Sequence, residues 1–437
     1  MSSHSGLALV GALLNRTKIK QRLDGFQLPG CREPSISHCD IVFSMVGLLC
    51  LAKPDFEAIE PFREQPFFKQ SLGIEKCPSS PTLRQRLKTI ENNFDQMLKQ
   101  ESADLVRKTA PAITPVSTSN GPLVPLDIDV SPFDNSKTKK EGVSRTYKGF
   151  DGYAPIFAYL GREGYLVDLE LREGKQHCQK ETPDFLRSSI KYAKQITDDR
   201  LLVRLDSGND SLENIRICID EDVDFIIKRN LRKERLEDWL KTAQEAGHLE
   251  YSDDRKTVWR GTTYRKVEGF ASPLRIEFEV VERRVVKGEV LLFPQIDVET
   301  FWTILSVGPG EVIELYHDHG TSEQYHSELK TDMDLERLPS ESFELNALVL
   351  LLGMLAYNIL RLCGQESLRE DNGTLGKRPS YRRKSSRRRL RTVIQDLIYL
   401  AGRVVSHSRK LYISFGMYSP WAEVWNDLYL SFMAADT

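Results

Sequence analysis

The chain has 437 residues, more than one hydrophobic core usually holds, so we expect two to four packed units. Its 61 Lys and Arg residues against 63 Asp and Glu residues leave the net charge near zero, which gives no global argument for nucleic-acid binding. The 7 cysteines are scattered without a disulfide or zinc spacing, so a reducing cytoplasm is the expected location. The longest apolar runs, 41–52 and 347–356, are shorter than the ~20 residues that cross a bilayer, and we expect no membrane association.

Residues 1–118 are expected to form a helical region that binds DNA. From 41 to about 100, short apolar-periodic segments are broken at prolines. The sequence Ser-Ser-Pro-Thr at 79–82 indicates the N-terminus of a helix, because hydroxyl groups and a first-turn proline precede basic residues there. The second helix of a helix-turn-helix is built in this way, with Arg84 and Arg86 where bases and phosphates are met. An ordinary amphipathic helix with a basic face is the alternative interpretation.

A mixed α/β core follows a stretch, 102–122, whose Thr, Ser, Pro and Ala content predicts a linker. The core elements are predicted in the order β-β-β-α-β-α-β, with strands at 123–130, 153–160, 165–171, 201–205 and 223–228 and helices at 183–196 and 211–218. A hairpin followed by helical crossovers predicts a mixed sheet flanked by helices. We assign this core to 119–231 and 311–365.

Between the two halves of the core, residues 232–310 are predicted to form a β-rich insertion. A charged helix opens it and antiparallel strands follow, with the helix at 233–246 and the strands at 256–267, 274–285, 289–293 and 302–305. Helical periodicity returns at Glu323 and continues through 343–362.

The C-terminal region, 366–437, is expected to be basic and helical. Lys or Arg occupies eight of the fourteen positions of 378–391, and a helical pattern continues from 392 to about 405. The density of this basic run predicts phosphate contacts by Arg387 and Arg388, although such runs often form only a solvated face.

Two predicted strands end in an aspartate followed by small residues. These are Asp129 and Asp206, and neighbouring strands would set the two carboxylates side by side. Asp127 competes with Asp129, because residues two apart on a strand share a face, but the small residue after Asp129 favours the latter. Paired carboxylates suit Mg²⁺ or Mn²⁺, and a third carboxylate would allow a site for two ions.

Glu323 is the candidate for the third carboxylate because it begins a helix just after the insertion. Helical spacing places Lys330 on the same face, where it would contact the phosphate backbone of bound DNA. Glu328 is a weaker candidate, expected to point to solvent. His326 is either a neighbour of the ligands or a solvated side chain, and the sequence does not decide between these.

The segment from Tyr316 to Glu323, with Lys330 seven residues later, resembles the Y-x-x-R-x-x-x-E-x6-K signature of DDE transposases of bacterial insertion sequences. The segments around Asp129 and Asp206 resemble the first two aspartate motifs of that family. The resemblance covers about half of the chain and implies a ribonuclease-H-like, retroviral-integrase-like fold. It also implies two bound metal ions, binding of terminal inverted repeats and target DNA through Tyr316 and other residues, and a homodimer on DNA in the cytoplasm.

His319 stands where the signature has arginine. Arginine is always charged and binds phosphate in bidentate fashion, whereas histidine is only partly charged at neutral pH. The phosphate-binding role of this position is therefore in question. In related enzymes an aromatic residue of the insertion stacks on a flipped base, and Trp259 and Trp302 are candidates, although core packing is the simpler interpretation for each.

These patterns predict a DNA transposase that cuts element ends and joins them to target DNA. Two other interpretations remain at this stage. A non-catalytic DNA-binding protein derived from a transposase would bind DNA without cutting it. A carboxylate-based hydrolase of a small substrate or glycan would act without DNA or metal, but it leaves the basic segments unexplained.

Overall fold

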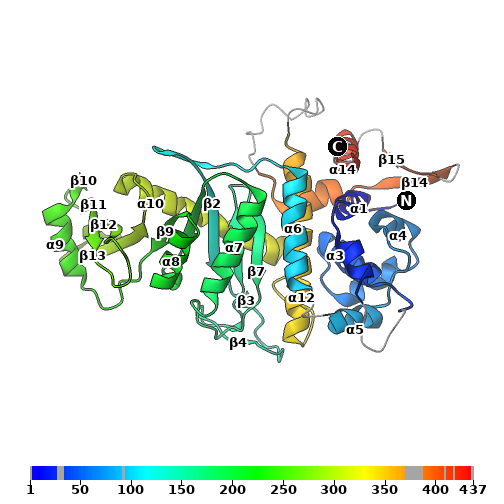
Figure 1. Ribbon diagram of the computed structural model, residues 1–437, viewed down its shortest axis with the longest axis horizontal. Helices are drawn as coiled ribbons and strands as arrows, with labels where there is room; N and C mark the ends of the chain where they lie inside the picture. Colours follow the sequence, from blue (N-terminus) through cyan, green and yellow to red (C-terminus); the bar gives the residue numbers. More distant parts are fainter. Residues whose placement is uncertain are drawn as a thin grey trace.

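Figure 1 shows the computed structural model, which describes residues 2–26, 34–90, 94–369, 387–407, 410–416 and 419–434. A long mixed sheet runs from the insertion at one end of the molecule to the centre, where helices α6 and α12 stand beside it. The N-terminal helices form the other end, and both chain ends lie there. This arrangement confirms the predicted α/β class with helical regions at both termini.

Helices fill the chain before the sheet. They are α1 (Leu7–Asn15), α2 (Ile19–Asp24), α3 (His38–Cys50), the 3-10 helix η1 (Phe56–Phe62), α4 (Pro66–Leu72), α5 (Ser80–Ile90) and α6 (Asp95–Thr109). Helix α5 starts as predicted, with the backbone N–H of Thr82 donating to the Ser79 hydroxyl at 3.4 Å.

Helix α6 overturns the first part of the predicted linker at 102–122. It continues to Thr109 and packs against α7 and α12. Its buried positions, Ser102, Ala103, Leu105 and Val106, follow helical spacing. The linker prediction failed because this face is short and mixes serine and alanine with only two large apolar residues.

The core sheet has the predicted order of elements. It consists of β1 (Val116–Thr118), β2 (Gly121–Val130), β6 (Ile156–Leu160), β7 (Tyr165–Glu170), β8 (Leu201–Leu205) and β9 (Asp224–Lys228), with α7 (Thr182–Ile196) and α8 (Leu212–Asp220) as crossovers. A small sheet, β3 (Phe133–Asp134), β4 (Ser144–Arg145) and β5 (Asp151–Tyr153), interrupts it.

Strand β2 is central because it pairs antiparallel with β6 and parallel with β8. The order across the core is β7-β6-β2-β8-β9. Every residue of β6 and β8 is buried, which is typical of strands covered on both faces and explains their unbroken apolar runs.

The insertion extends the same sheet. It contains α9 (Leu236–Ala246), β10 (His248–Ser252), β11 (Lys256–Arg265), β12 (Leu274–Val286) and β13 (Glu289–Thr303). Strand β13 pairs with β9, with Phe301 opposite Lys228, so the insertion strands continue the core sheet outward. The two strands predicted at 289–293 and 302–305 are one strand. The polar stretch between them is held by backbone pairing with β12, which a hydrophobicity pattern does not report.

The chain after the insertion returns to helix earlier than predicted. Its elements are α10 (Pro309–His317), η3 (Asp318–Thr321), α11 (Ser322–Ser327), the π-helical segment η4 (Glu328–Asp332) and α12 (Phe343–Glu366). The C-terminal part contains α13 (Leu390–Val393), η6 (Ile394–Ile398), β14 (Gly402–His407), β15 (Lys410–Phe415) and α14 (Ala422–Met433). The helix predicted at 392–405 is therefore wrong beyond Ile398, where a β14–β15 hairpin forms.

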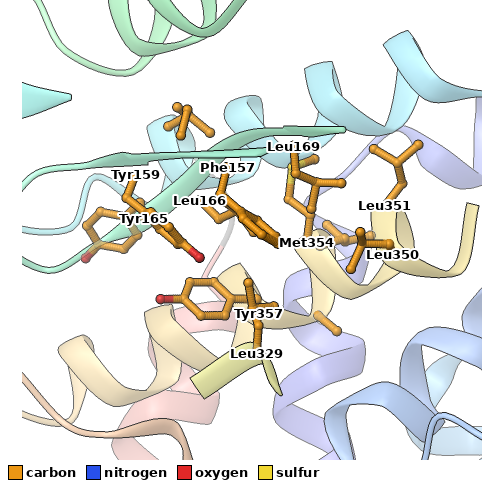
Figure 2. Close-up of a cluster of buried hydrophobic side chains, with 14 of the residues drawn as sticks. Phe157, Tyr159, Tyr165, Leu166, Leu169, Leu329, Leu350, Leu351, Met354 and Tyr357 are labelled. Atoms are coloured by element: carbon orange, nitrogen blue, oxygen red, sulfur yellow. The ribbon is translucent and has the colours of Figure 1, made fainter. Parts of the chain in front are cut away.

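Helix α12 is the common core of the molecule. It packs against α3 and α6 on the side of the N-terminal helices and against β7 of the sheet. Figure 2 shows side chains of β6 and β7 meeting those of α12 and η4, among them Phe157, Tyr159, Leu166, Leu169, Leu329, Leu350, Met354 and Tyr357. By length and composition α12 could cross a membrane, but 94% of its most apolar window is buried inside the protein, as in the core helix of a globular protein.

Candidate active site

Asp129 and Asp206 lie side by side at the carboxyl ends of two parallel strands. Asp129 is the penultimate residue of β2, and Asp206 directly follows β8. The register pairs Ile128 with Leu205, so the two aspartates occupy the next matched positions. Burial, and then the negative charge of Asp129, raises the pKa of Asp206. The two carboxylates are therefore close enough to repel each other.

Asp127, the competing aspartate, is neutralised inside the protein. Both of its oxygens accept from Arg204, at 2.5 Å and 2.8 Å, and His319 Nδ1 lies 3.1 Å from it. Burial opposes ionisation of Asp127, but the Arg204 and His319 charges outweigh it and hold its pKa well below the usual range. Because Asp127 is bound in this way, Asp129 is the carboxylate that faces Asp206.

His319, at the arginine position of the signature, is buried against Asp127. Burial alone would lower the pKa of His319. The negative charge of Asp127, together with the hydrogen bond to it, outweighs burial and leaves the pKa raised. Arg204 also donates to the backbone oxygen of Leu315 at 2.6 Å. His319 and Arg204 together tie the segment after the insertion to the sheet. His319 is 7% exposed, so its ring is enclosed by protein groups.

His326 orients Asp129. Its Nε2 lies 3.2 Å from Asp129 Oδ2, and its Nδ1 lies 3.2 Å from the Tyr159 hydroxyl. Burial lowers the pKa of His326 and favours the neutral ring. One neutral tautomer satisfies both neighbours, because Nε2–H donates to Asp129 while Nδ1 accepts from Tyr159. The sequence left the role of His326 open. Its position three residues after Glu323, on the same helical face, is the signal that pointed to it.

Glu323 lies on α11 with an exposed side chain. It stands four residues after His319 and three before His326, and both histidines contact aspartates of β2. Within the part of the chain that the structure describes, no group of three or more His, Cys, Asp or Glu side chains is already assembled to hold a metal ion. Among the described residues, Asp129 and Asp206 lie together, and Glu323 lies on the adjoining helix without a hydrogen bond to either.

Lys330 and Tyr316 stand around the two acids. The Lys330 ammonium donates to the backbone oxygen of Pro132 at 2.7 Å, and burial lowers its pKa to about 8. The Tyr316 ring packs on Phe301 at 4.8 Å between centroids. Burial, and then the charges of Asp206 and Asp129, raises the pKa of Tyr316. Both residues predicted to contact DNA are thus near the carboxylate pair.

Comparison with known proteins identifies the chain. A family model described as transposase DDE domain group 1 matches residues 1–435. The chain belongs to this family and is a DNA transposase. A cryo-EM structure of a piggyBac transposase synaptic complex with hairpin DNA is similar, with a TM-score of 0.41 and 9% identity over 99% of this chain and 81% of that one. Among the curated proteins, none matches.

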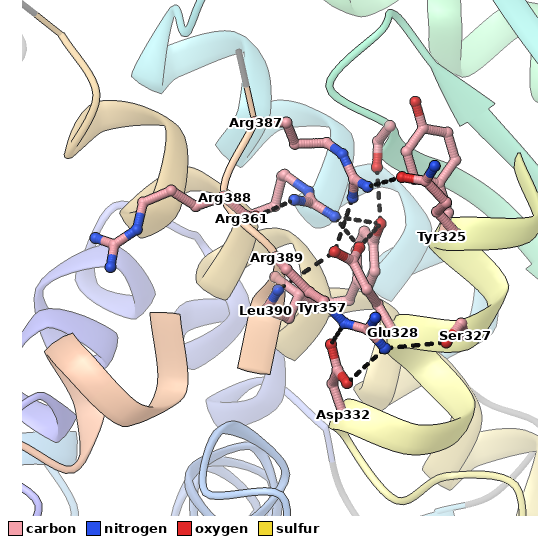
Figure 3. A network of polar contacts seen from close by, with 12 residues as sticks. Tyr325, Ser327, Glu328, Asp332, Tyr357, Arg361, Arg387, Arg388, Arg389 and Leu390 are labelled. Carbon is pink, nitrogen blue, oxygen red and sulfur yellow. Dashed lines mark hydrogen bonds and ion pairs between the residues drawn. The ribbon is translucent and has the colours of Figure 1, made fainter. Parts of the chain in front are cut away.

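Glu328 of the transposase is buried, so the prediction that it points to solvent is wrong. It forms ion pairs with Arg361 and with Arg387, the latter at 2.7 Å, and its carboxylate also accepts from the backbone N–H of Leu390 at 3.3 Å. Figure 3 shows these groups converging on the Glu328 carboxylate from α12 and from the segment before α13. The network fixes η4, and with it the end of α11, to the protein core.

The basic residues predicted to bind DNA in the C-terminal region make contacts within the protein. Arg387 bonds to Glu328 and Gln324, and Arg388 is buried, bonded to Asp396 at 2.6 Å and placed over the Trp421 ring. Both guanidinium groups are therefore engaged by protein groups in this structure, and their contact with DNA stays a prediction. Residues 378–386 of the basic run lie outside the described residues.

Arg84 and Arg86 on α5 are also engaged within the N-terminal helices. Arg84 donates to Glu57 at 2.6 Å, and Arg86 donates to the backbone oxygen of Ile36 at 3.0 Å. About half of the Arg84 side chain remains exposed, which keeps it accessible to a phosphate.

The two insertion tryptophans lie in packed surroundings. Trp302 is 5% exposed, donates from Nε1 to Asp210 at 2.9 Å and lies under the Arg229 guanidinium. Trp259 is partly buried against the core. Core packing is therefore the structural role of Trp302, and its ring has no free face for a base.

Proposed function

We propose that this transposase is a metal-dependent DDE enzyme that cleaves DNA at element ends and transfers the cut strands into target DNA. The single observation that carries the proposal is the pairing of Asp129 and Asp206 at adjacent strand ends. The nearby Arg204 is bound to Asp127, and burial together with the charge of Asp129 leaves the pKa of Asp206 raised.

The residues present fit a divalent metal ion. Carboxylate oxygens are the preferred ligands of Mg²⁺ and Mn²⁺. The pKa of Asp206 is raised first by burial and then by the charge of Asp129, and a bound cation would relieve that repulsion. We propose Asp129 and Asp206 as its ligands, with His326 orienting Asp129. A divalent ion held by Asp129 and Asp206 would supply polarisation of the phosphodiester and activation of an attacking hydroxyl. Lys330 and Tyr316 would position the DNA backbone beside the acids.

Metal dependence is the experiment that tests this function. A DNA fragment that carries the inverted repeats flanking the gene should be cut by the purified protein in Mg²⁺ or Mn²⁺, and cutting should cease in EDTA because two repelling carboxylates alone cannot activate a hydroxyl. Denaturing gels of end-labelled DNA would measure the products. Equal cutting in EDTA would overturn the mechanism, whereas DNA binding without cutting in either metal would favour a non-catalytic transposase derivative.

We propose Glu323 as the third metal ligand. On a helix, positions 319, 323 and 326 fall on one face, and the two histidines of this set already meet the aspartates of β2. Glu323 lies between them and is exposed, so its side chain can turn toward the acids without disturbing the core. The family signature places its glutamate at this same position.

Replacing Glu323 by Gln should lower the cleavage rate by about 10²-fold or more, because a neutral amide cannot share the charge of the metal site. The melting temperature should stay unchanged, because the side chain is exposed. Glu314→Gln, an exposed glutamate on α10, is the matched control and should cleave at the normal rate. If both variants cut DNA equally well, another residue supplies the third ligand.

We further propose that the substrate is a pair of terminal inverted repeats and that a homodimer holds them, since two ends must be cut and joined in one event. The origin in an insertion sequence and a place of action in the cytoplasm, at the nucleoid, belong to the same proposal.

A further inference from the structure

A tight turn at 146–150, between β4 and β5, stands beside the carboxylate pair. The Thr146 N–H and hydroxyl both donate to the backbone oxygen of Phe150 at 2.8 Å, and the Gly149 N–H donates to the Thr146 oxygen at 3.0 Å. Gly149 has a φ of 84°, which few other residues adopt. These bonds make the turn a fixed support for the two residues at its tip, Tyr147 and Lys148.

Tyr147 presents its ring to solvent while its hydroxyl is tied down. The residue is 68% exposed, the largest exposure of a tyrosine among the described residues. Its hydroxyl donates at 3.1 Å to the backbone oxygen of Val130, the neighbour of Asp129. Burial of the hydroxyl, and then the charges of Asp129 and Asp206, raises the pKa of Tyr147. The hydroxyl therefore holds the ring beside the acid pair in a defined orientation.

Two lysines, Lys148 and Lys330, lie on the same side of the site as the Tyr147 ring. Lys148 is close enough to Lys330 to contribute to the lowering of the Lys330 pKa. An exposed aromatic ring next to cations is the combination with which proteins hold single nucleotides, since the ring stacks on a base and the cations meet its phosphates. No packing role explains the exposure of the Tyr147 ring.

We propose that Tyr147 stacks on the base next to the phosphodiester held at Asp129 and Asp206, with Lys148 on the adjoining phosphate. This inference rests on the proposed function, because it takes the acid pair as the cleavage site. It assigns the aromatic contact to the core hairpin rather than to the insertion, where the Trp302 ring is covered. Tyr147 is a positioning residue, since it touches the substrate base and not the reacting atoms.

The test uses the full chain with Asp206 replaced by Asn, so that DNA is bound and not cut. 2-Aminopurine is placed in turn at each position flanking the cleavage site, and its fluorescence reports stacking. We expect quenching at one position that is lost in Tyr147→Ala and Tyr147→Leu and kept in Tyr147→Phe, which retains the ring. Affinity for the DNA should fall about tenfold in the first two variants, the scale of one stacked base.

Tyr264→Ala is the matched control, because Tyr264 is 65% exposed but lies on β11 of the insertion. Quenching and affinity should be unchanged in this variant. Quenching that persists in Tyr147→Leu with DNA bound and the melting temperature unchanged would overturn the proposal. That result would leave the proposed function standing if the unaltered chain still cuts in Mg²⁺, and a chain that never cuts would defeat the function instead.

Discussion

Replacing Asp206 by asparagine should reduce DNA cleavage by about 10³-fold or more while leaving DNA binding intact. Asparagine keeps the shape of the side chain and removes its charge, so the site would lose one of the two carboxylates that we propose as metal ligands. Asp206 also repels Asp129 in the described structure. Without metal, the Asp206→Asn protein should therefore be as stable as the original protein or slightly more stable. Gel assays of cleavage and binding, with thermal unfolding in EDTA, measure these effects.

Asp220→Asn is the control for this substitution, because Asp220 is exposed at the end of the helix that follows the same strand. It should cut and bind DNA normally. Cleavage by Asp206→Asn at the normal rate would remove Asp206 from the site. Loss of both binding and stability would instead mean that Asp206 supports the fold, which its repelled charge argues against.

The carboxylate pair could be predicted from the sequence because each aspartate lies at the end of a strand that its apolar run identifies. Buried parallel strands read as short apolar runs, and their carboxyl ends meet at one edge of a sheet. The sequence did not decide as clearly whether Asp127 or Asp129 is the metal-ligand candidate. The two share a face of β2, and what separates them is Arg204 on the neighbouring strand, which binds Asp127. That partner lies 77 residues away in the chain.

The wrong predictions lie where a residue far away in the chain determines the local structure. Glu328 looks like a solvent-facing charge in its own helix, and it is buried because arginines from two other segments meet it. Residues 392–405 begin with helical apolar spacing, and the chain leaves the helix to pair β14 with β15. The predicted strands at 289–293 and 302–305 merge for a similar reason, since β12 pairs with the polar residues between them.

Removing the Glu328 carboxylate should destabilise the fold more than the substitutions of Asp206, Glu323 or Tyr147. Glu328→Ala leaves the fully buried Arg361 guanidinium without its counter-charge, at a cost of about 3–5 kcal/mol in the free energy of unfolding. The Arg387 and Leu390 contacts to the same carboxylate are lost as well. Urea or guanidinium titration would measure the loss, and Glu323→Gln, an exposed change five residues earlier, should leave the midpoint unmoved.

The double variant Glu328→Met, Arg361→Met separates the charge of this pair from its packing. Because burying an ion pair costs desolvation, two apolar side chains of similar size should restore most of the stability lost in Glu328→Ala. Cleavage should recover with it, since the network fixes η4 and the end of α11, the helix that holds His326 against Asp129. If stability returns and cleavage does not, the Glu328 carboxylate takes part in the site itself rather than only holding the helix that serves it.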